Sequence, residues 1–278
     1  MNEVTIIIIT YKSEKIIYDF LEKIPSNIKI IIVENSENHK LKKKIQEKFK
    51  NVLFYIRENN GVSSSINYAV DKIQTKYFLQ ISPDIEFDYK DLDIFCEYAK
   101  KLNNKFAAIG PRFLNVDEKS HNQINEKLEY DKINSIHGSC MFMNKENFNK
   151  IGRFDENFFL YFEETEFCYR AKKKGYFSYQ INKTKVKTIG RSVDINNDKN
   201  QKFDNILIWH FIWSKFYFSK KRYGKFISLI IFFPLLIRIL SKIIYYKIFK
   251  NENLLNKYKY RFDGLLKSMQ GKKSYLRP

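Results

Sequence analysis

Short apolar runs that alternate with helix-forming segments constrain the fold of this 278-residue chain more than any other feature. The runs are rich in Ile, Val and Phe and have the length of buried strands. The segments between them have helical spacing or composition, and this alternation predicts a parallel, right-handed, doubly wound α/β sheet. The expected strands are Val4–Thr10, Ile28–Val33, Val52–Ile56 and Tyr77–Ile81, and the expected helices between them span 16–24, 40–49 and 63–73.

Each expected strand is followed by a polar residue, and these residues are Thr10, Glu34, Asn59 and Asp84. Because parallel strands end at one edge of a sheet, we expect the four side chains to gather there, where open α/β sheets bind ligands. Asp84 follows a strand that Ser82-Pro83 interrupts, since proline cannot donate to a ladder. Such a carboxylate would hold a nucleotide diphosphate through a hard divalent cation, or it would be a turn aspartate that caps the next helix.

A second informative region, FDENFFLYFEETEFCYR, brings carboxylates and aromatic residues together at 154–170. In a helix that begins at Glu163, Glu166 can pair with Arg170 on the face of Glu163, whereas Glu164 points elsewhere. A carboxylate beside aromatic side chains has a raised pKa and can serve as a general base. The alternative is an acidic first helical turn that the helix dipole favours.

The sequence lacks the signature motifs of several function classes. Neither GxGxxG nor GxxxxGK[ST] occurs, which argues against a dinucleotide enzyme and a P-loop NTPase. The three cysteines, Cys96, Cys140 and Cys168, include no CxxC pair, which fits a reducing cytosol better than a disulfide framework or a zinc site. The apolar run at the N-terminus is too short for a signal peptide or a membrane span.

The formal net charge of +19 is concentrated at the C-terminal end of the chain. Residues 199–278 hold 18 Lys and Arg against 3 Asp and Glu, whereas residues 1–198 are nearly neutral. The charge therefore predicts a globular domain at 1–198 and a basic, aromatic helical tail at 199–278. Such a tail suggests an anionic membrane surface or nucleic acid as its partner.

The tail also contains a twelve-residue apolar run, 226–237, preceded by Trp209 and Trp213. Twelve residues are too few to span a bilayer of ~30 Å, and we expect a helix that lies in the membrane interface. The alternative is a helical pair that packs on the catalytic domain or on a second copy, as in a homodimer. A nucleic-acid-binding protein is less favoured, because nucleic acid does not bind such an apolar run. Basic or aromatic residues then recur at every fourth position, at Arg238, Lys242, Tyr246 and Lys250.

Five stretches in order, TIIIITYKS, IIIVENS, NNGVSSSIN, YFLQISPDIEF and GRFDENFFLYFEETEFCYRAKKKGY, resemble the family 2 glycosyltransferases of GT-A fold. The resemblance covers residues 4–192 and is nearest to the rhamnosyltransferase-like branch that builds bacterial cell-surface polysaccharides. It implies a GT-A-type catalytic domain at 1–198 with a doubly wound, mainly parallel sheet, a nucleotide-sugar half at 1–90 and an acceptor half at 91–198. The tail at 199–278, beyond the resemblance, is the expected C-terminal helical, membrane-interface appendage.

The resemblance also implies roles for individual residues. Asp84 matches the metal-binding carboxylate of a DxD-like motif, and Glu164 matches the catalytic base. The implied acceptor-side residues are Glu163, Glu166 and Arg170. The implied donor-binding residues are Thr10, Tyr11, Glu34, Asn59, Gly61, Asn67 and Arg191.

Three positions depart from the family pattern. Glu34 and Glu164 stand where the family has aspartate, which lengthens each side chain by one methylene group. Thr188 stands where the family often has a histidine that helps to hold the metal or the diphosphate, and Arg191 is near enough in sequence to neutralise the diphosphate instead. These departures keep a catalytically inactive GT-A scaffold open as an alternative.

The implied reaction is inverting transfer of a sugar from a nucleotide-diphosphate sugar to a saccharide or lipid-linked acceptor. Mg²⁺ or Mn²⁺ is the implied cofactor, held by Asp84. The expected location is cytoplasmic, peripheral on the inner face of the bacterial cytoplasmic membrane.

Overall fold

The computed structural model describes all residues except 1–2, 116–122, 191–192 and 194–196. The chain forms two compact units. The first, the α/β unit, comprises Met1–Asp155 and Glu163–Asp194. The second, the helical unit, comprises Glu156–Phe162 and Ile195–Pro278, so it contains a short segment from the middle of the chain. The sequence analysis placed a single boundary at 198 and assigned that segment to the catalytic domain.

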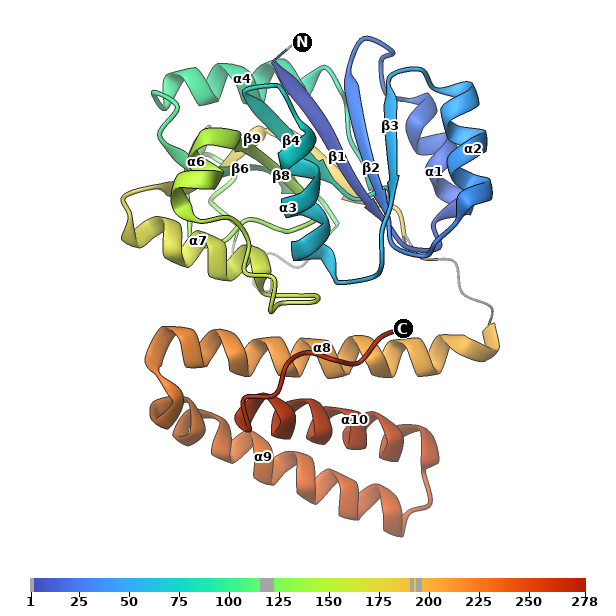
Figure 1. Ribbon diagram of the computed structural model, residues 1–278. Helices are drawn as coiled ribbons and strands as arrows, with labels where there is room; N and C mark the ends of the chain where they lie inside the picture. The colour runs from blue at the N-terminus through green and yellow to red at the C-terminus, as the bar shows by residue number, and fades with distance from the viewer. Residues whose placement is uncertain (1–2, 116–122, 191–192, 194–196) are drawn as a thin grey trace. The chain divides into compact units, whose positions relative to one another are not determined.

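The α/β unit is built on one mixed sheet with the strand order β3-β2-β1-β4-β8-β6-β9-β5, and β7 pairs with β9 (Figure 1). The pairings make β1–β4, β6 and β9 run in one direction and β5, β7 and β8 in the other. The strands are β1 Val4–Thr10, β2 Lys29–Glu34, β3 Val52–Ile56, β4 Tyr77–Ile81, β5 Ile85–Glu86, β6 Phe106–Phe113, β7 Tyr130–Ile133, β8 Cys140–Asn144 and β9 Phe177–Thr188.

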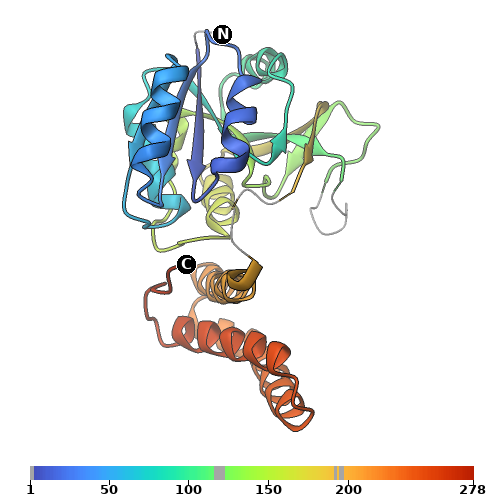
Figure 2. The same cartoon turned by 90° about the vertical axis from the view of Figure 1, so that its right-hand side faces the viewer.

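Helices cover both faces of this sheet, as Figures 1 and 2 show. Side chains alternate between the faces along each strand, so Ile6 and Ile8 pack under α1, α2 and α4, while Ile7 packs under α3, α6 and α7. Both faces are therefore apolar, which explains the continuous isoleucine run in β1. These helices are α1 Glu14–Glu22, α2 His39–Lys48, α3 Val62–Lys72, α4 Asp91–Lys101, α6 Lys145–Ile151 and α7 Glu163–Lys173.

The helical unit consists of three helices, α8 Asn197–Tyr223, α9 Lys225–Ile248 and α10 Glu252–Met269, together with residues 156–162. Its core joins Phe216 of α8, Phe232 of α9 and Leu265 of α10. At Gly264 the helices α8 and α10 come so close that an added Cβ would lie 2.6 Å from the carbonyl oxygen of Trp209. Glycine is therefore required for this packing.

The apolar run 226–237 is only part of a longer helix. Helix α9 continues through Pro234 and the basic residues that follow the run, and it ends at Ile248. The 24-residue helix is long and apolar enough to cross a membrane by length and composition. The prediction that Trp209 and Trp213 flank a membrane interface was wrong. Both are buried, and their indole N–H groups donate to Asp263 and to the carbonyl of Lys272 at 2.7 and 3.1 Å.

Candidate active site

The carboxyl edge of the sheet begins with Thr10 and Glu34, which are paired across β1 and β2. Glu34 is fully buried, and its Oε1 accepts a hydrogen bond of 2.7 Å from the backbone N–H of Ser36 and another from the Ser36 hydroxyl. Its Oε2 and the hydroxyl of Thr10 are buried without a hydrogen-bond partner among the described residues. Buried polar atoms without partners are costly, so this corner is prepared to receive polar groups of a ligand.

Gly61 lies farther along the carboxyl edge, at the N-cap of α3, where it adopts a φ of 95°. This left-handed backbone favours glycine, and it aims the first turn of the helix at the same edge as Glu34. Ser65 in that turn donates to the Asn35 side chain at 3.0 Å, which fixes α3 to the exit of β2. Asn59 and Tyr11, both half-buried, lie in the loops that follow β3 and β1.

Asp84 lies where β4 ends, held from both sides by backbone hydrogen bonds. The N–H of Ser82 donates to the carbonyl of Ser139 at 2.9 Å, and the N–H of Ile189 donates to the carbonyl of Asp84 at 2.8 Å. The carboxylate Oδ1 is buried without a partner among the described residues, and burial raises the pKa of Asp84. A bound cation would reverse this shift, because an adjacent positive charge favours the ionised carboxylate.

The residues around Asp84 meet the modest requirements of a magnesium or manganese site. Among the described residues no group of three or more His, Cys, Asp or Glu side chains converges. Mg²⁺ needs only one or two carboxylates when substrate phosphates and water complete its shell, so the unpartnered oxygen of Asp84 fits. Thr188 pairs with Ile85 beside it, and its backbone N–H donates to the Asn115 side chain at 3.0 Å. Arg191, the other predicted diphosphate contact, lies outside the described residues.

Glu163 and Glu164 begin α7 directly after two residues with left-handed backbone, Tyr161 at φ 67° and Phe162 at φ 68°. Such conformations are unfavourable for bulky residues and persist where packing enforces them, often beside functional groups. Burial raises the pKa of both glutamates, and the charge of Glu164 raises that of Glu163 further. Glu164 accepts a hydrogen bond of 3.0 Å from Thr165, whereas Oε2 of Glu163 is buried and has no hydrogen-bond partner within the described part of the chain.

These environments separate the roles of the two carboxyl groups. Two adjacent buried carboxylates do not both ionise readily. Glu163 is the more deeply buried, and burial raises its pKa well above the ordinary value, so of the two carboxyl groups it has the stronger preference for the protonated form. Glu164, whose pKa is also raised by burial, is then the better candidate for a general base.

The turn 137–139 contacts both the loop that carries Asp84 and the side chain of Glu164. Ser139 receives the N–H of Ser82 at the base of the Asp84 loop, and a Cβ on Gly138 would lie 3.6–3.7 Å from the Glu164 side chain. His137 shapes this turn, because its Nδ1 lies 2.6 Å from the Ser139 hydroxyl. The sequence analysis left His137 unassigned. The signal that it missed was the position of the turn at the start of a strand antiparallel to β4, which returns it to the carboxyl edge.

Three predicted site residues make structural contacts instead of pointing into this space. The Asn67 carboxamide donates to the carbonyl of Phe154 at 3.0 Å and accepts from its N–H at 3.2 Å. Arg170 pairs with buried Glu166 at 2.7 Å, as the helical spacing predicted. It also donates to the carbonyls of Ile151, at 2.9 Å, and Arg153. We therefore assign these residues to the support of the segment that carries Glu163 and Glu164.

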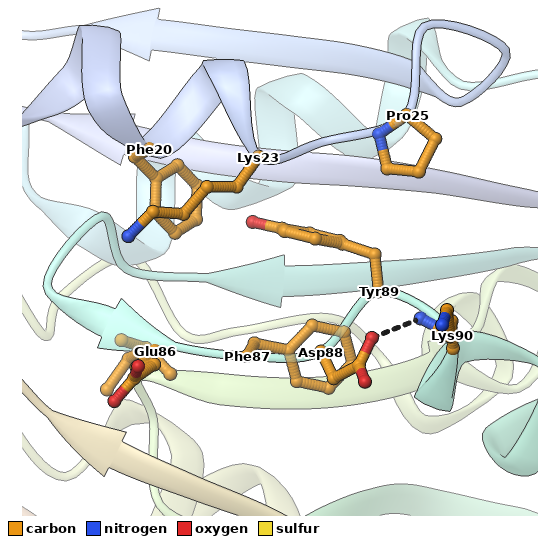
Figure 3. Close-up of a pocket in the computed structure, with 9 residues that line it drawn as sticks. Phe20, Lys23, Pro25, Glu86, Phe87, Asp88, Tyr89 and Lys90 are labelled. Atoms are coloured by element: carbon orange, nitrogen blue, oxygen red, sulfur yellow. Dashed lines mark hydrogen bonds between the residues drawn. The ribbon is translucent and has the colours of Figure 1, made fainter.

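A separate groove of about 470 Å³ lies between α1 and the segment that follows β5 (Figure 3). The ring of Tyr89 crosses it with the hydroxyl directed toward Phe20 and Lys23, and Asp88 accepts from the backbone N–H of Lys90 at 3.0 Å. Neither Asp84 nor Glu164 lines the groove, and Asp88 is exposed. This hollow is therefore not part of the candidate active site.

A comparison with protein-family models finds a match that lies within the α/β unit. Residues 5–152 match the family model of glycosyl transferase family 2. A low-salt glycan biosynthesis hexosyltransferase, Agl10 of Haloferax volcanii, is 27% identical over 63% of this chain and 63% of its own length. A dTDP-rhamnosyl transferase, RfbF of Shigella flexneri, is 29% identical over 54% of this chain and 55% of its own length. This chain thus spans less than two thirds of either relative.

Among solved structures, the mannosyltransferase PcManGT of Pyrobaculum calidifontis, in complex with GDP-Man and Mn²⁺, superimposes with a TM-score of 0.63. The comparison covers 98% of this chain and 88% of that enzyme at 12% sequence identity. At this identity the likeness concerns the fold, and it confirms the predicted GT-A-type α/β architecture.

Proposed function

Since the chain belongs to glycosyl transferase family 2, we propose that it transfers a sugar from a nucleotide-diphosphate sugar to a hydroxyl group of a saccharide or lipid-linked acceptor. The observation that carries this proposal is the turn 137–139, which contacts both the Asp84 loop and Glu164. We infer from these contacts that one carboxylate suited to a cation and one suited to a base face the same substrate. The rhamnosyl and hexosyl relatives favour a hexose or deoxyhexose donor for surface glycans.

The proposed reaction is a direct displacement at the anomeric carbon, with inversion. Glu164 takes the proton of the acceptor hydroxyl as its oxygen forms the new bond to the anomeric carbon. The bond between that carbon and the phosphate oxygen breaks, and its electron pair leaves with the nucleoside diphosphate. A divalent ion held by Asp84 and phosphate oxygens would neutralise the charge that develops on the leaving group. The raised pKa of Glu163 favours its protonated form, which would leave the negative charge of the pair to Glu164.

We assign the nucleoside of the donor to the part of the carboxyl edge of the sheet that Thr10 and Glu34 form. The hydroxyl of Thr10 and Oε2 of Glu34 are acceptors that ribose hydroxyls or base N–H groups can satisfy. Glu34 is already oriented by Ser36, so its remaining oxygen is fixed before the donor arrives. Such preorganisation lowers the entropic cost of binding.

The test is release of nucleoside diphosphate from UDP-, GDP- and dTDP-sugars by the full-length protein, with Mn²⁺, with Mg²⁺ and with EDTA. We expect release from one nucleotide series, its loss with EDTA, and a thermal shift with that diphosphate only when metal is present. Asp84→Asn should abolish both effects, whereas the matched variant Asp88→Asn, at an exposed carboxylate outside the site, should retain them. Neither release nor a thermal shift with any of these donors would contradict the proposal and favour an inactive scaffold.

A further inference from the structure

Helix α9 has one packed face and one exposed apolar face. Its packed face buries Phe232 and Ile239 against α8 and α10. Residues at intervals of three or four lie along one side of a helix, and the opposite side of α9 presents such a set. These side chains, 37–76% exposed, are Phe226, Ile230, Phe233, Ile237, Leu240, Ile244 and Ile248. We call this set the α9 stripe.

The charged side chains of α9 and of most of α8 are all positive. Between residues 205 and 251 the chain has nine Lys and Arg and no Asp or Glu. Lys225 begins α9, and Lys247 and Lys250 lie at its other end. Of the predicted polar row along α9, Tyr246 faces α10, where it stacks on Tyr258 with ring centroids 5.5 Å apart, whereas Arg238 is exposed. The α9 stripe is therefore apolar, with basic residues at both ends of the helix and an exposed arginine beside its middle.

We propose that the α9 stripe lies in the interfacial layer of an anionic bilayer, with the helix axis parallel to the membrane plane. An apolar face with basic flanks is the composition of helices that bind in this way, and the lysines at its ends are complementary to acidic headgroups. This inference rests on the helical unit alone and is independent of the proposed transferase activity. It would place the protein peripherally on the cytoplasmic face of a membrane.

Two other environments for the α9 stripe, a membrane-spanning position and an interface with a second copy of the chain, fit the structure less well. A helix of 24 residues is long enough to span, but spanning would separate α9 from Phe216 and Leu265 and carry Arg238 and Lys242 toward hydrocarbon. A second copy of the chain would bring these all-positive flanks together, which disfavours a dimer through this face. The bilayer surface is the occupant that satisfies both the apolar stripe and the charge.

The first test is flotation of the full-length protein with vesicles of phosphatidylcholine alone or with 30% phosphatidylglycerol. We expect binding to the anionic vesicles, at least tenfold weaker binding to the neutral ones, and release at 1 M salt or alkaline pH. Ile230→Asp and the pair Lys247→Glu and Lys250→Glu should each weaken binding at least tenfold. The matched controls are Leu53→Asp, at an exposed position of β3, and the pair Lys43→Glu and Lys44→Glu on α2. These variants should bind the anionic vesicles like the wild type.

The second test measures depth. A tryptophan is placed at Phe226, Ile237 or Ile248, and its quenching by lipids brominated at different chain positions is measured above the wild-type background. Equal, shallow depth at all three positions supports the proposal, whereas a deep middle position with shallow ends would show a span and overturn it. Failure to bind anionic vesicles would also overturn it, as would a stable dimer in solution that Ile230→Asp dissociates.

Discussion

His210 makes the stability of the helical unit depend on pH. The imidazole is fully buried in α8, with Nε2 2.8 Å from the carbonyl of Leu276 and Nδ1 2.9 Å from the Ser274 hydroxyl. Its ring stacks on Phe159, with centroids 4.4 Å apart. The pKa of His210 is lowered from 6.5 to about 4, mainly by burial and in smaller part by the charge of Arg277, against the opposing hydrogen bond to Leu276.

The direction of the effect follows from this lowered pKa. Between pH 6.5 and about 4 the unfolded chain binds a proton that the folded chain does not, so the free energy of unfolding decreases as the pH falls. The contribution is fully present above pH 6.5 and is lost by about pH 4. Each pH unit corresponds to about 1.4 kcal/mol, so the loss over this interval is about 3 kcal/mol.

Urea unfolding followed by tryptophan fluorescence measures this loss in the helical unit alone, because both tryptophans of the chain, Trp209 and Trp213, lie in α8. Between pH 7 and pH 4 the wild-type protein should lose about 3 kcal/mol more than His210→Gln, in which the titrating group is absent. His39→Gln, at an exposed position on α2, should behave like the wild type. Equal pH dependence in wild type and His210→Gln would refute the reasoning.

Three further predictions concern the α/β unit. Arg170→Ala removes the guanidinium that pairs with buried Glu166 and should cost about 3 kcal/mol of stability by urea unfolding followed by circular dichroism; a cost below about 1 kcal/mol would contradict this. Gly138→Ala adds a Cβ at ordinary contact distance from Glu164, so stability should stay within about 0.5 kcal/mol while turnover falls roughly tenfold; unchanged turnover would remove the turn from the site. Glu34→Gln should weaken nucleoside diphosphate binding by roughly 10- to 100-fold in calorimetry, as the loss of one charged hydrogen bond predicts; unchanged affinity would exclude this contact.

The sequence predicted the first four strands and most of the helices because local composition determines them. β1, β3 and β4 have the predicted bounds, and β2 differs by one residue at each end. These are short apolar runs that bury both faces. The long strand β9, Phe177–Thr188, was not predicted, because it alternates buried residues with lysines and pairs with β6 through register shifts.

The prediction of individual side-chain contacts was less complete because those contacts are long-range. Asn67 meets Phe154 across 87 residues of chain. Residues 156–162 pack with α8, where Phe158 contacts Tyr217 with ring centroids 4.9 Å apart, although their sequence follows the α/β unit directly. Local patterns identify the chemical types of the residues, whereas the packing of distant segments decides which of them face a ligand.

The comparison of Glu164→Gln with Glu163→Gln tests the central claim most directly. We measure the rate of sugar transfer or donor hydrolysis together with the dissociation constant for the nucleoside diphosphate. Glu164→Gln should keep donor affinity and lose roughly 10²- to 10⁴-fold in rate, as removal of a general base predicts. Glu163→Gln should keep most of the rate, because the raised pKa of Glu163 favours the neutral form that glutamine mimics. A wild-type rate for Glu164→Gln would contradict the account.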